Sequence, residues 1–360
     1  MVGGYGGGLP LGLSSRERVL TVFEHGEPDR VPCWCGSSDE FWVKAKAVLG
    51  VDDEGLRVCF GDDFRRVRVG YGGPEFPLLH PRATYRTVFG VEREGLGYGQ
   101  PIEHPLAGAS LRAIHDYAWP DPAWADVGGV REAALAWNGD YAILGGDWSP
   151  FWHDAIDLLG MEELMLRMYE DPEAVDALFG HLVDYYHAVS ARIFDAAADV
   201  LDIFFIGNDF GTQLGPLVSE PLFRRYLEPH LAQLAELGHA YGLNVMMHCC
   251  GGVAELIPAF MDAGIDAIHA VQPSCRGMDL RLLKETFGER MVFNGAIDSH
   301  HVLIDGTPAS VRQATAEVLA IMKPGGGFIA GASHDSILEE TPVENVVAMF
   351  DAIREFGGYE

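Results

Sequence analysis

The sequence lacks any apolar run of the roughly 18 to 20 residues that a membrane-spanning helix needs. Its first 13 residues are rich in glycine and contain no lysine or arginine ahead of a short apolar stretch, so they do not resemble a secretory signal. We therefore predict a flexible tail over residues 1–13 and a cytoplasmic protein without a membrane partner.

Basic residues are also scarce. The chain has 25 lysines and arginines against 53 aspartates and glutamates, which gives a net charge of −28. Such a field repels nucleic acid and anionic membrane surfaces, so neither is expected as a partner. It also disfavours a highly anionic substrate, unless the pocket is locally basic.

Cysteine is sparse, with six residues in a chain of 360. In a cytoplasmic protein of this length they are not expected to form a disulfide framework. Cys33, Cys35 and Cys59 are predicted to be free and buried. The adjacent pair Cys249 and Cys250 is not explained by an ordinary disulfide.

The sequence does contain enough apolar side chains for a large core, since 48% of its residues are hydrophobic. After residue 140, short apolar runs alternate with stretches of helical spacing. This alternation predicts a parallel α/β sheet, and its number of repeats fits a closed (β/α)₈ TIM barrel. We expect one barrel domain over residues 14–360, with an irregular insertion at about 70–122 over the barrel mouth.

Local signals place the individual elements. Ser14 and Glu17 have the spacing of a capping box, which should begin the first helix. Long helical stretches are expected at about 154–194 and 221–241. The strands are expected at residues 30–36, 141–145, 200–206, 244–248, 265–271, 291–294 and 328–330.

Polar residues follow five successive strands, at the end of the barrel where active sites lie. The segments concerned are residues 207–213, 248–252, 272–273, 294–298 and 331–335. Because the carboxyl ends of parallel strands meet at one rim, we predict a single site around His248, Cys250 and His334.

His248 and Cys250 are two residues apart at a strand end. On an extended backbone this spacing points both side chains the same way, so that an imidazole and a thiolate can share one ion. Nitrogen and sulfur ligands together favour Zn²⁺. A third protein ligand is then required; His334 is the first candidate, and Cys275 or a carboxylate is the alternative. His334 fits a metal-free catalytic or hydrogen-bonding role equally well.

Two carboxylates, Asp209 and Asp298, are candidate catalytic groups. Each is suited to act as a general base, a substrate anchor or a partner of the ligand histidines. The competing interpretation is that each caps a backbone turn. The candidates for substrate contacts are Asn208, Gln213, Gln272 and Trp148.

These residues carry a family resemblance. The segments 208–213, 248–252 and 271–273 resemble the uroporphyrinogen decarboxylase-like superfamily, as do residues 295–298, 324–327 and 341–345. The resemblance spans about residues 15–357 and is strongest after residue 200. It implies a TIM barrel with its site at the strand ends.

Two branches of this superfamily differ at identifiable positions. True uroporphyrinogen decarboxylases carry an R-Q-A-G-R motif after the first strand that grips substrate carboxylates, whereas residues 35–40 here contain no arginine. A histidine near the C-terminal T-P-x-E-N motif is a decarboxylase feature, and His334 resembles it. The other branch holds zinc-dependent methyltransferases that act with corrinoid proteins on thiols, methylamines or methoxylated compounds. There a motif like His248-x-Cys250 binds zinc, and a cysteine is expected where this sequence has His334.

The resemblance thus implies a zinc-dependent methyltransferase or demethylase component. It would move a methyl group between a small methylated substrate or thiol and a corrinoid. The cobalamin would sit on a partner protein over the barrel mouth, since no separate corrinoid-binding domain is recognisable in the chain. Two alternatives stay open: a metal-free decarboxylase or lyase that uses His334 and Asp209, and a non-catalytic barrel that binds a corrinoid or small molecule. The oligomeric state is also open, with a homodimer among the options.

Overall fold

A computed structural model describes residues 12–95, 99–137 and 139–359. Most of the tail predicted over residues 1–13 lies outside the described residues. Within the described part, no helix combines the length and the apolar character that crossing a membrane requires.

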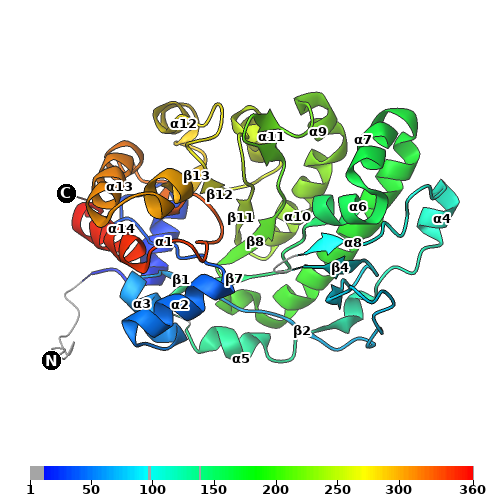
Figure 1. Cartoon of the computed structure of the whole chain (residues 1–360), viewed down its shortest axis with the longest axis horizontal. Coiled ribbons are helices and arrows are strands. Elements are labelled where there is room, and N and C mark those ends of the chain that lie inside the picture. The colour runs from blue at the N-terminus through cyan, green and yellow to red at the C-terminus, as the bar shows by residue number, and fades with distance from the viewer. Residues whose placement is uncertain (1–11, 96–98, 138, 360) are drawn as a thin grey trace.

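A seven-stranded parallel sheet forms the centre of the molecule, with helices packed around its outside (Figure 1). Its strands neighbour one another in chain order, as in a TIM barrel. The apolar runs after residue 140 therefore form the predicted strands. In order, the strands are β1 (Phe64–Arg66), β7 (Ala142–Gly145), β8 (Ile203–Gly207), β11 (Asn244–His248), β12 (Ala267–Val271), β13 (Val292–Ile297) and β14 (Phe328–Ala332).

The segment predicted as the first strand, residues 30–36, closes the barrel. Cys33 makes parallel bridges to Ala330 of β14 on one side and to Asp62 before β1 on the other. The Trp34 amide donates to the Ala330 carbonyl at 2.9 Å, and the Asp63 amide donates to the Cys33 carbonyl at 3.0 Å. This segment therefore takes the eighth place in the ring, and the (β/α)₈ prediction is confirmed.

Alternation along the strands decides which side chains face the barrel axis. A cluster of buried apolar residues, including Phe64, Phe205 and Met246, fills the interior. Two residues beyond Met246 along β11 comes His248, which is therefore on the same face. His248 pairs in register with His269 of β12, so both imidazoles lie at one level above the apolar interior.

Helices cover the barrel, and α1 begins with the predicted capping box of Ser14 and Glu17. The stretch predicted as one helix over 154–194 is three helices, which are interrupted at Gly160 and Asp171. The helices are α1 (Ser15–Phe23), α2 (Asp39–Leu49), α3 (Asp53–Phe60), α5 (Val130–Leu135), α6 (Phe151–Leu159), α7 (Met161–Glu170), α8 (Pro172–Ala197), α9 (Glu220–Tyr226), α10 (Glu228–Ala240), α11 (Ile257–Asp262), α12 (Leu280–Phe287), α13 (Pro308–Met322) and α14 (Val343–Phe356), with short turns η1 (Pro122–Trp124), η2 (Ala198–Val200), η3 (Ala254–Leu256) and η4 (Ser299–Ile304).

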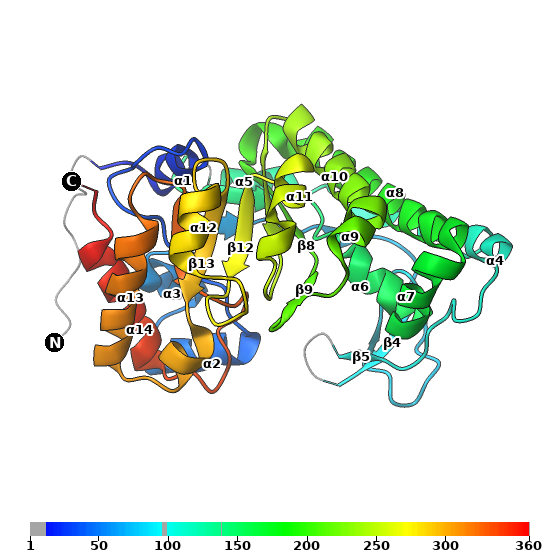
Figure 2. The ribbon, with the colours of Figure 1, turned by 90° about the horizontal axis from the view of Figure 1, so that it is seen from above.

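The described residues of the irregular region at 70–122 form short antiparallel strands and the short helix α4. It packs beside α6, α7 and α8, at the end of the molecule remote from α13 and α14 (Figure 2). Arg93 of β4 pairs with Asp157 of α6, and His104 Nδ1 lies 2.8 Å from the Asp157 carbonyl oxygen. The elements are β2 (Gly70–Tyr71), β3 (Tyr85–Arg86), β4 (Glu92–Glu94), β5 (Gln100–Pro101), α4 (Leu111–His115) and β6 (Ala125–Asp126), and β2 pairs with β6.

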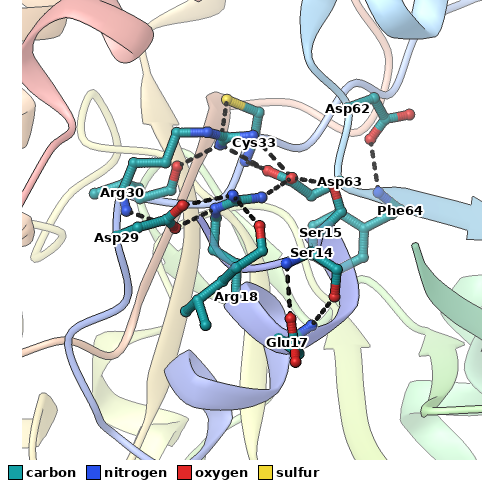
Figure 3. A network of polar contacts seen from close by, with 12 residues as sticks. Ser14, Ser15, Glu17, Arg18, Asp29, Arg30, Cys33, Asp62, Asp63 and Phe64 are labelled. Atoms are coloured by element: carbon teal, nitrogen blue, oxygen red, sulfur yellow. Dashed lines mark hydrogen bonds and ion pairs between the residues drawn. The ribbon is translucent and has the colours of Figure 1, made fainter. Parts of the chain in front are cut away.

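A buried carboxylate holds the amino-terminal end of the barrel together. Asp63, which is completely buried, accepts from the Arg18 and Arg30 guanidinium groups at 2.8 to 2.9 Å and from the Cys33 amide at 2.7 Å. The Ser15 hydroxyl also donates to it at 2.6 Å. Figure 3 shows these donors converging on the Asp63 carboxylate from α1 and the strand segment.

All six cysteines are free of disulfides, in agreement with the prediction that they form no disulfide framework. Cys33 and Cys35 are buried, also as predicted. The prediction that Cys59 is buried was wrong. Cys59 lies on α3 with its side chain exposed.

Candidate metal centre

Three side chains with metal-ligating atoms meet at the carboxyl ends of β8 and β11. Cys250 Sγ lies 3.2 Å from His248 Nε2, and Asp209 Oδ1 lies 3.3 Å from the same nitrogen. All three ligand atoms are within 4.8 Å of one another. Of the five rim segments that the sequence singled out, those after β8 and β11 supply this group.

Close contact between two loops creates the group. Gly251 has a φ of +98°, and a Cβ there would lie 2.6 Å from the Gly211 carbonyl carbon. Only glycine permits this left-handed backbone so near another chain segment. The approach lets the Cys250 amide donate to Asp209 Oδ1 at 2.8 Å, which ties the carboxylate to the cysteine backbone.

Asp209 is held on both of its oxygens. Besides its contacts through Oδ1, its Oδ2 lies 3.3 Å from Nε2 of His153, in the first turn of α6. Burial alone would raise the pKa of Asp209, but the hydrogen bonds with His153 and His248 hold that pKa well below its usual range. The group is therefore a carboxylate at neutral pH and can serve as an oxygen ligand.

The donor set fits a zinc ion. Bond lengths of about 2.0 to 2.3 Å at tetrahedral angles place two ligand atoms about 3.3 to 3.6 Å apart, and the separations of 3.2 and 3.3 Å are close to this. Imidazole, thiolate and carboxylate are all ligands that Zn²⁺ accepts. Burial would lower the pKa of His248, but the neighbouring Cys250 and Asp209 raise it well above its usual range.

A second group shares His248 and was missed by the sequence reasoning. His269 Nδ1 lies 3.1 Å from His248 Nδ1 and 3.8 Å from Asp335 Oδ1. His269 is fully buried, and this burial together with the neighbouring His248 lowers its pKa well below the usual value. The sequence could have indicated this residue, because His269 follows Ala267 by two residues and therefore points into the barrel as Ala267 does.

His334 is not brought into either group. Its Nδ1 accepts from the Ser336 amide at 3.1 Å and lies 3.0 Å from the Ser336 carbonyl oxygen, so it closes a local turn after β14. Asp209 joins His248 and Cys250 instead, which matches the carboxylate alternative for the third ligand. The other alternative, Cys275, has its Sγ 3.5 Å from Gln272 Oε1 and is likewise outside both groups.

Two other predicted site residues serve the backbone. Asp298 Oδ1 accepts from the amides of His300 and His301 at 2.9 and 2.7 Å, as an N-cap of η4. Asn208 is completely buried, and its amide group joins the Trp152 amide and the Ser149 carbonyl. In both cases the side chain orders a turn beside the site.

The other residues predicted to contact the substrate differ in burial and in their distance from the ligand atoms. Gln272 Oε1 accepts from the Gly251 amide at 2.8 Å, whereas Gln213 is exposed in the hairpin of β9 (Gly211–Thr212) and β10 (Gly215–Pro216). The ring of Trp148 lies 5.6 Å from that of His248. It covers Gly207, where a Cβ would collide with the indole at 1.9 Å.

Known proteins resemble this chain over most of its length. Residues 127–356 match the family described as Uroporphyrinogen decarboxylase (URO-D). The methylated-thiol–coenzyme M methyltransferase of Methanosarcina mazei is 23% identical over 287 residues, which cover 74% of each chain. A uroporphyrinogen decarboxylase of Coxiella burnetii is 22% identical over 189 residues, 52% of this chain and 49% of that protein.

A solved structure has the same fold. The structure of a methyltransferase from Methanosarcina mazei matches with a TM-score of 0.69 and 19% identity, over 96% of this chain and 99% of the other. The family match covers more than half of the chain and includes the segments that carry Asp209, His248 and Cys250. The chain belongs to the uroporphyrinogen decarboxylase (URO-D) family.

Proposed function

We propose that this protein is a zinc-dependent methyltransferase whose metal is held by His248 Nε2, Cys250 Sγ and Asp209 Oδ1. One observation carries the proposal: these three atoms lie within 4.8 Å of one another at the rim where TIM barrels have their active sites. Three protein ligands leave a fourth tetrahedral position open, as catalytic zinc sites require.

Zinc at this site would hold a substrate thiol as the nucleophilic thiolate. The chain's own residues prepare the position. Asp209 fixes the Cys250 backbone through its amide, and His153 holds the second oxygen of Asp209. The Trp148 ring lies 5.6 Å from the His248 ring, on one side of the site.

We further propose a small thiol as methyl acceptor and a corrinoid on a partner protein as methyl donor. The corrinoid would supply the methyl group, and His248, Cys250 and Asp209 would hold the zinc that keeps the accepting thiol as its thiolate. Support comes from the relative in Methanosarcina mazei, whose name specifies a methylated thiol and coenzyme M, and which matches over 74% of its length.

Elemental analysis tests the metal. Protein purified without added zinc or chelator should contain one zinc per chain, and Cys250→Ala and Asp209→Ala should lose it. His334→Ala is the matched control at the same rim and should keep its zinc. Zinc retained in Asp209→Ala but lost in His334→Ala would return the third-ligand role to His334.

Turnover tests the reaction. Free methylcobalamin and a small thiol replace the unidentified partner and acceptor, and the loss of the methylcobalamin absorbance is followed with time. Wild type should catalyse this loss, and Cys250→Ala should not. Zinc-free protein that decarboxylates a small carboxylate would instead favour the metal-free lyase.

A further inference from the structure

His248 and His269 face each other across neighbouring strands. The two residues are paired in the register of β11 and β12, and their rings lie 5.1 Å apart. Their Nδ1 atoms are 3.1 Å apart, which is hydrogen-bond distance. His248 is 6% exposed and His269 is fully buried, so solvent does not reach this contact.

A metal on His248 Nε2 would fix where the protons of this contact lie. A nitrogen-to-nitrogen hydrogen bond needs one donor and one acceptor, and a neutral imidazole carries a single N–H. Cys250 and Asp209 both approach the Nε2 atom of His248, so a metal bound there takes the Nε2 lone pair. The remaining proton of His248 is then on Nδ1 and is donated to Nδ1 of His269.

Packing against aromatic rings holds His269 in position to accept this hydrogen bond. The Trp34 ring lies 4.7 Å from its ring and the Phe205 ring 5.5 Å from it, on the apolar interior of the barrel. Asp335 Oδ1 lies 3.8 Å from Nδ1, beyond hydrogen-bond distance, so it does not accept a proton from this nitrogen.

We propose that His269 is a positioning residue that sets the tautomer and the ring orientation of the metal ligand His248. This inference rests on the proposed function, because it assumes that the metal binds His248 Nε2. Histidine ligands usually donate their second N–H to a partner, and loss of that partner typically costs about 10- to 100-fold in metal affinity. Here the partner is a second histidine.

Two substitutions of His269, each of which introduces a carboxamide, distinguish a positioning role from a role in packing alone. The Oδ1 atom of the substituted side chain in His269→Asn can occupy the place of Nδ1 and accept the proton from His248. In His269→Gln the amide is one carbon further out, near the place of Nε2, so that acceptor is misplaced. Both variants keep a buried amide, and circular dichroism checks that both fold.

The measurement is zinc affinity, from competition with a chromogenic chelator, together with the absorption spectrum of the Co²⁺-substituted protein. We expect His269→Gln to bind zinc about 10- to 100-fold more weakly and to shift the Co²⁺ bands, whereas His269→Asn should stay close to wild type. Equal affinity in the two variants would overturn the positioning role while leaving the zinc site intact. A wild type without zinc would instead overturn the proposed function and this inference with it.

Discussion

The two ends of the barrel treat buried polar side chains differently. At the amino-terminal end, Asp63 is surrounded by two arginines, a hydroxyl and a backbone amide, so its oxygens are saturated with donors (Figure 3). At the carboxyl end, His248 is surrounded by the nitrogen of His269, the sulfur of Cys250 and an oxygen of Asp209. These atoms have few N–H or O–H donors among them. A carboxylate whose oxygens all accept hydrogen bonds stabilises the fold. Side chains whose free lone pairs point to one place are suited to bind a metal ion.

The amino-terminal end repeats one device. Asp63, Asp202 and Asp266 each directly precede a strand, β1, β8 and β12 respectively, and each accepts the backbone amide of a residue in a neighbouring strand segment. The distances are 2.7, 2.9 and 2.7 Å. A carboxylate at this place pins adjacent strands together. Conversely, Asp209 follows its strand and is available to the site.

Removing the carboxylate of Asp63 should have the largest effect on stability. Asp63→Ala leaves Arg18 and Arg30 facing a buried space without their shared anion, and breaking a buried pair in this way costs about 3–5 kcal/mol. Chemical denaturation measures the loss. Asp29→Ala is the matched control, since Asp29 also pairs with Arg18 but is 34% exposed, and it should cost about 1 kcal/mol or less. Equal losses in the two variants would contradict the comparison.

Much of this fold could be predicted because the buried strands of a parallel sheet appear in the sequence as short runs of apolar residues. The exception was β1. Only three residues long, it contains Arg65 and Arg66, and Asp62 and Asp63 precede it. Arg65 is nevertheless buried, because its guanidinium stacks over Tyr141 at 3.7 Å and pairs with Glu54. Such compensation depends on distant residues, so it leaves no local pattern.

Only part of the candidate site could be predicted, because some of its residues also depend on distant contacts for their positions. His248, Cys250 and Asp209 follow strand ends directly, so topology alone brings them to one rim. His269 lies inside an apolar strand, where a histidine resembles a core residue. His153 lies on a helix, and its contact with Asp209 depends on how α6 leaves the rim. His334 follows β14 by two residues, and the local turn at Ser336 directs its Nδ1 to the backbone.

A pH experiment extends the comparison to Asp154 on α6. This buried carboxyl accepts from the Tyr186 hydroxyl, and burial raises its pKa to about 7 from an ordinary 3.8. Between those values the folded chain holds a proton that the unfolded chain has released, so stability falls as the pH rises, by up to about 1.4 kcal/mol per unit. The contribution of Asp154 to stability is therefore fully present below pH 3.8 and is lost by about pH 7.

The matched variant is Asp154→Asn, which keeps an oxygen acceptor for Tyr186 but does not titrate. The difference in free energy of unfolding between wild type and variant, measured at pH 5 and at pH 7.5, should move in favour of the variant at the higher pH. Contributions from other groups cancel in this difference. A constant difference would contradict the raised pKa of Asp154, because its carboxyl would then not titrate between pH 5 and pH 7.5 in the folded chain.

The smallest effect is expected at Asp298, which shares the rim with Asp209 but caps a turn. Asp298→Ala removes the acceptor for the His300 and His301 amides, and loss of such an N-cap costs about 0.5–2 kcal/mol. Because Asp298 is in neither candidate ligand group, zinc content should stay at the wild-type value. Asp209→Ala should show the reverse, with zinc lost and a smaller change in the stability of the metal-free protein. Denaturation of both variants with and without a chelator separates the two effects. Loss of zinc in Asp298→Ala would instead place this carboxylate in the site, although β12 lies between its strand, β13, and β11.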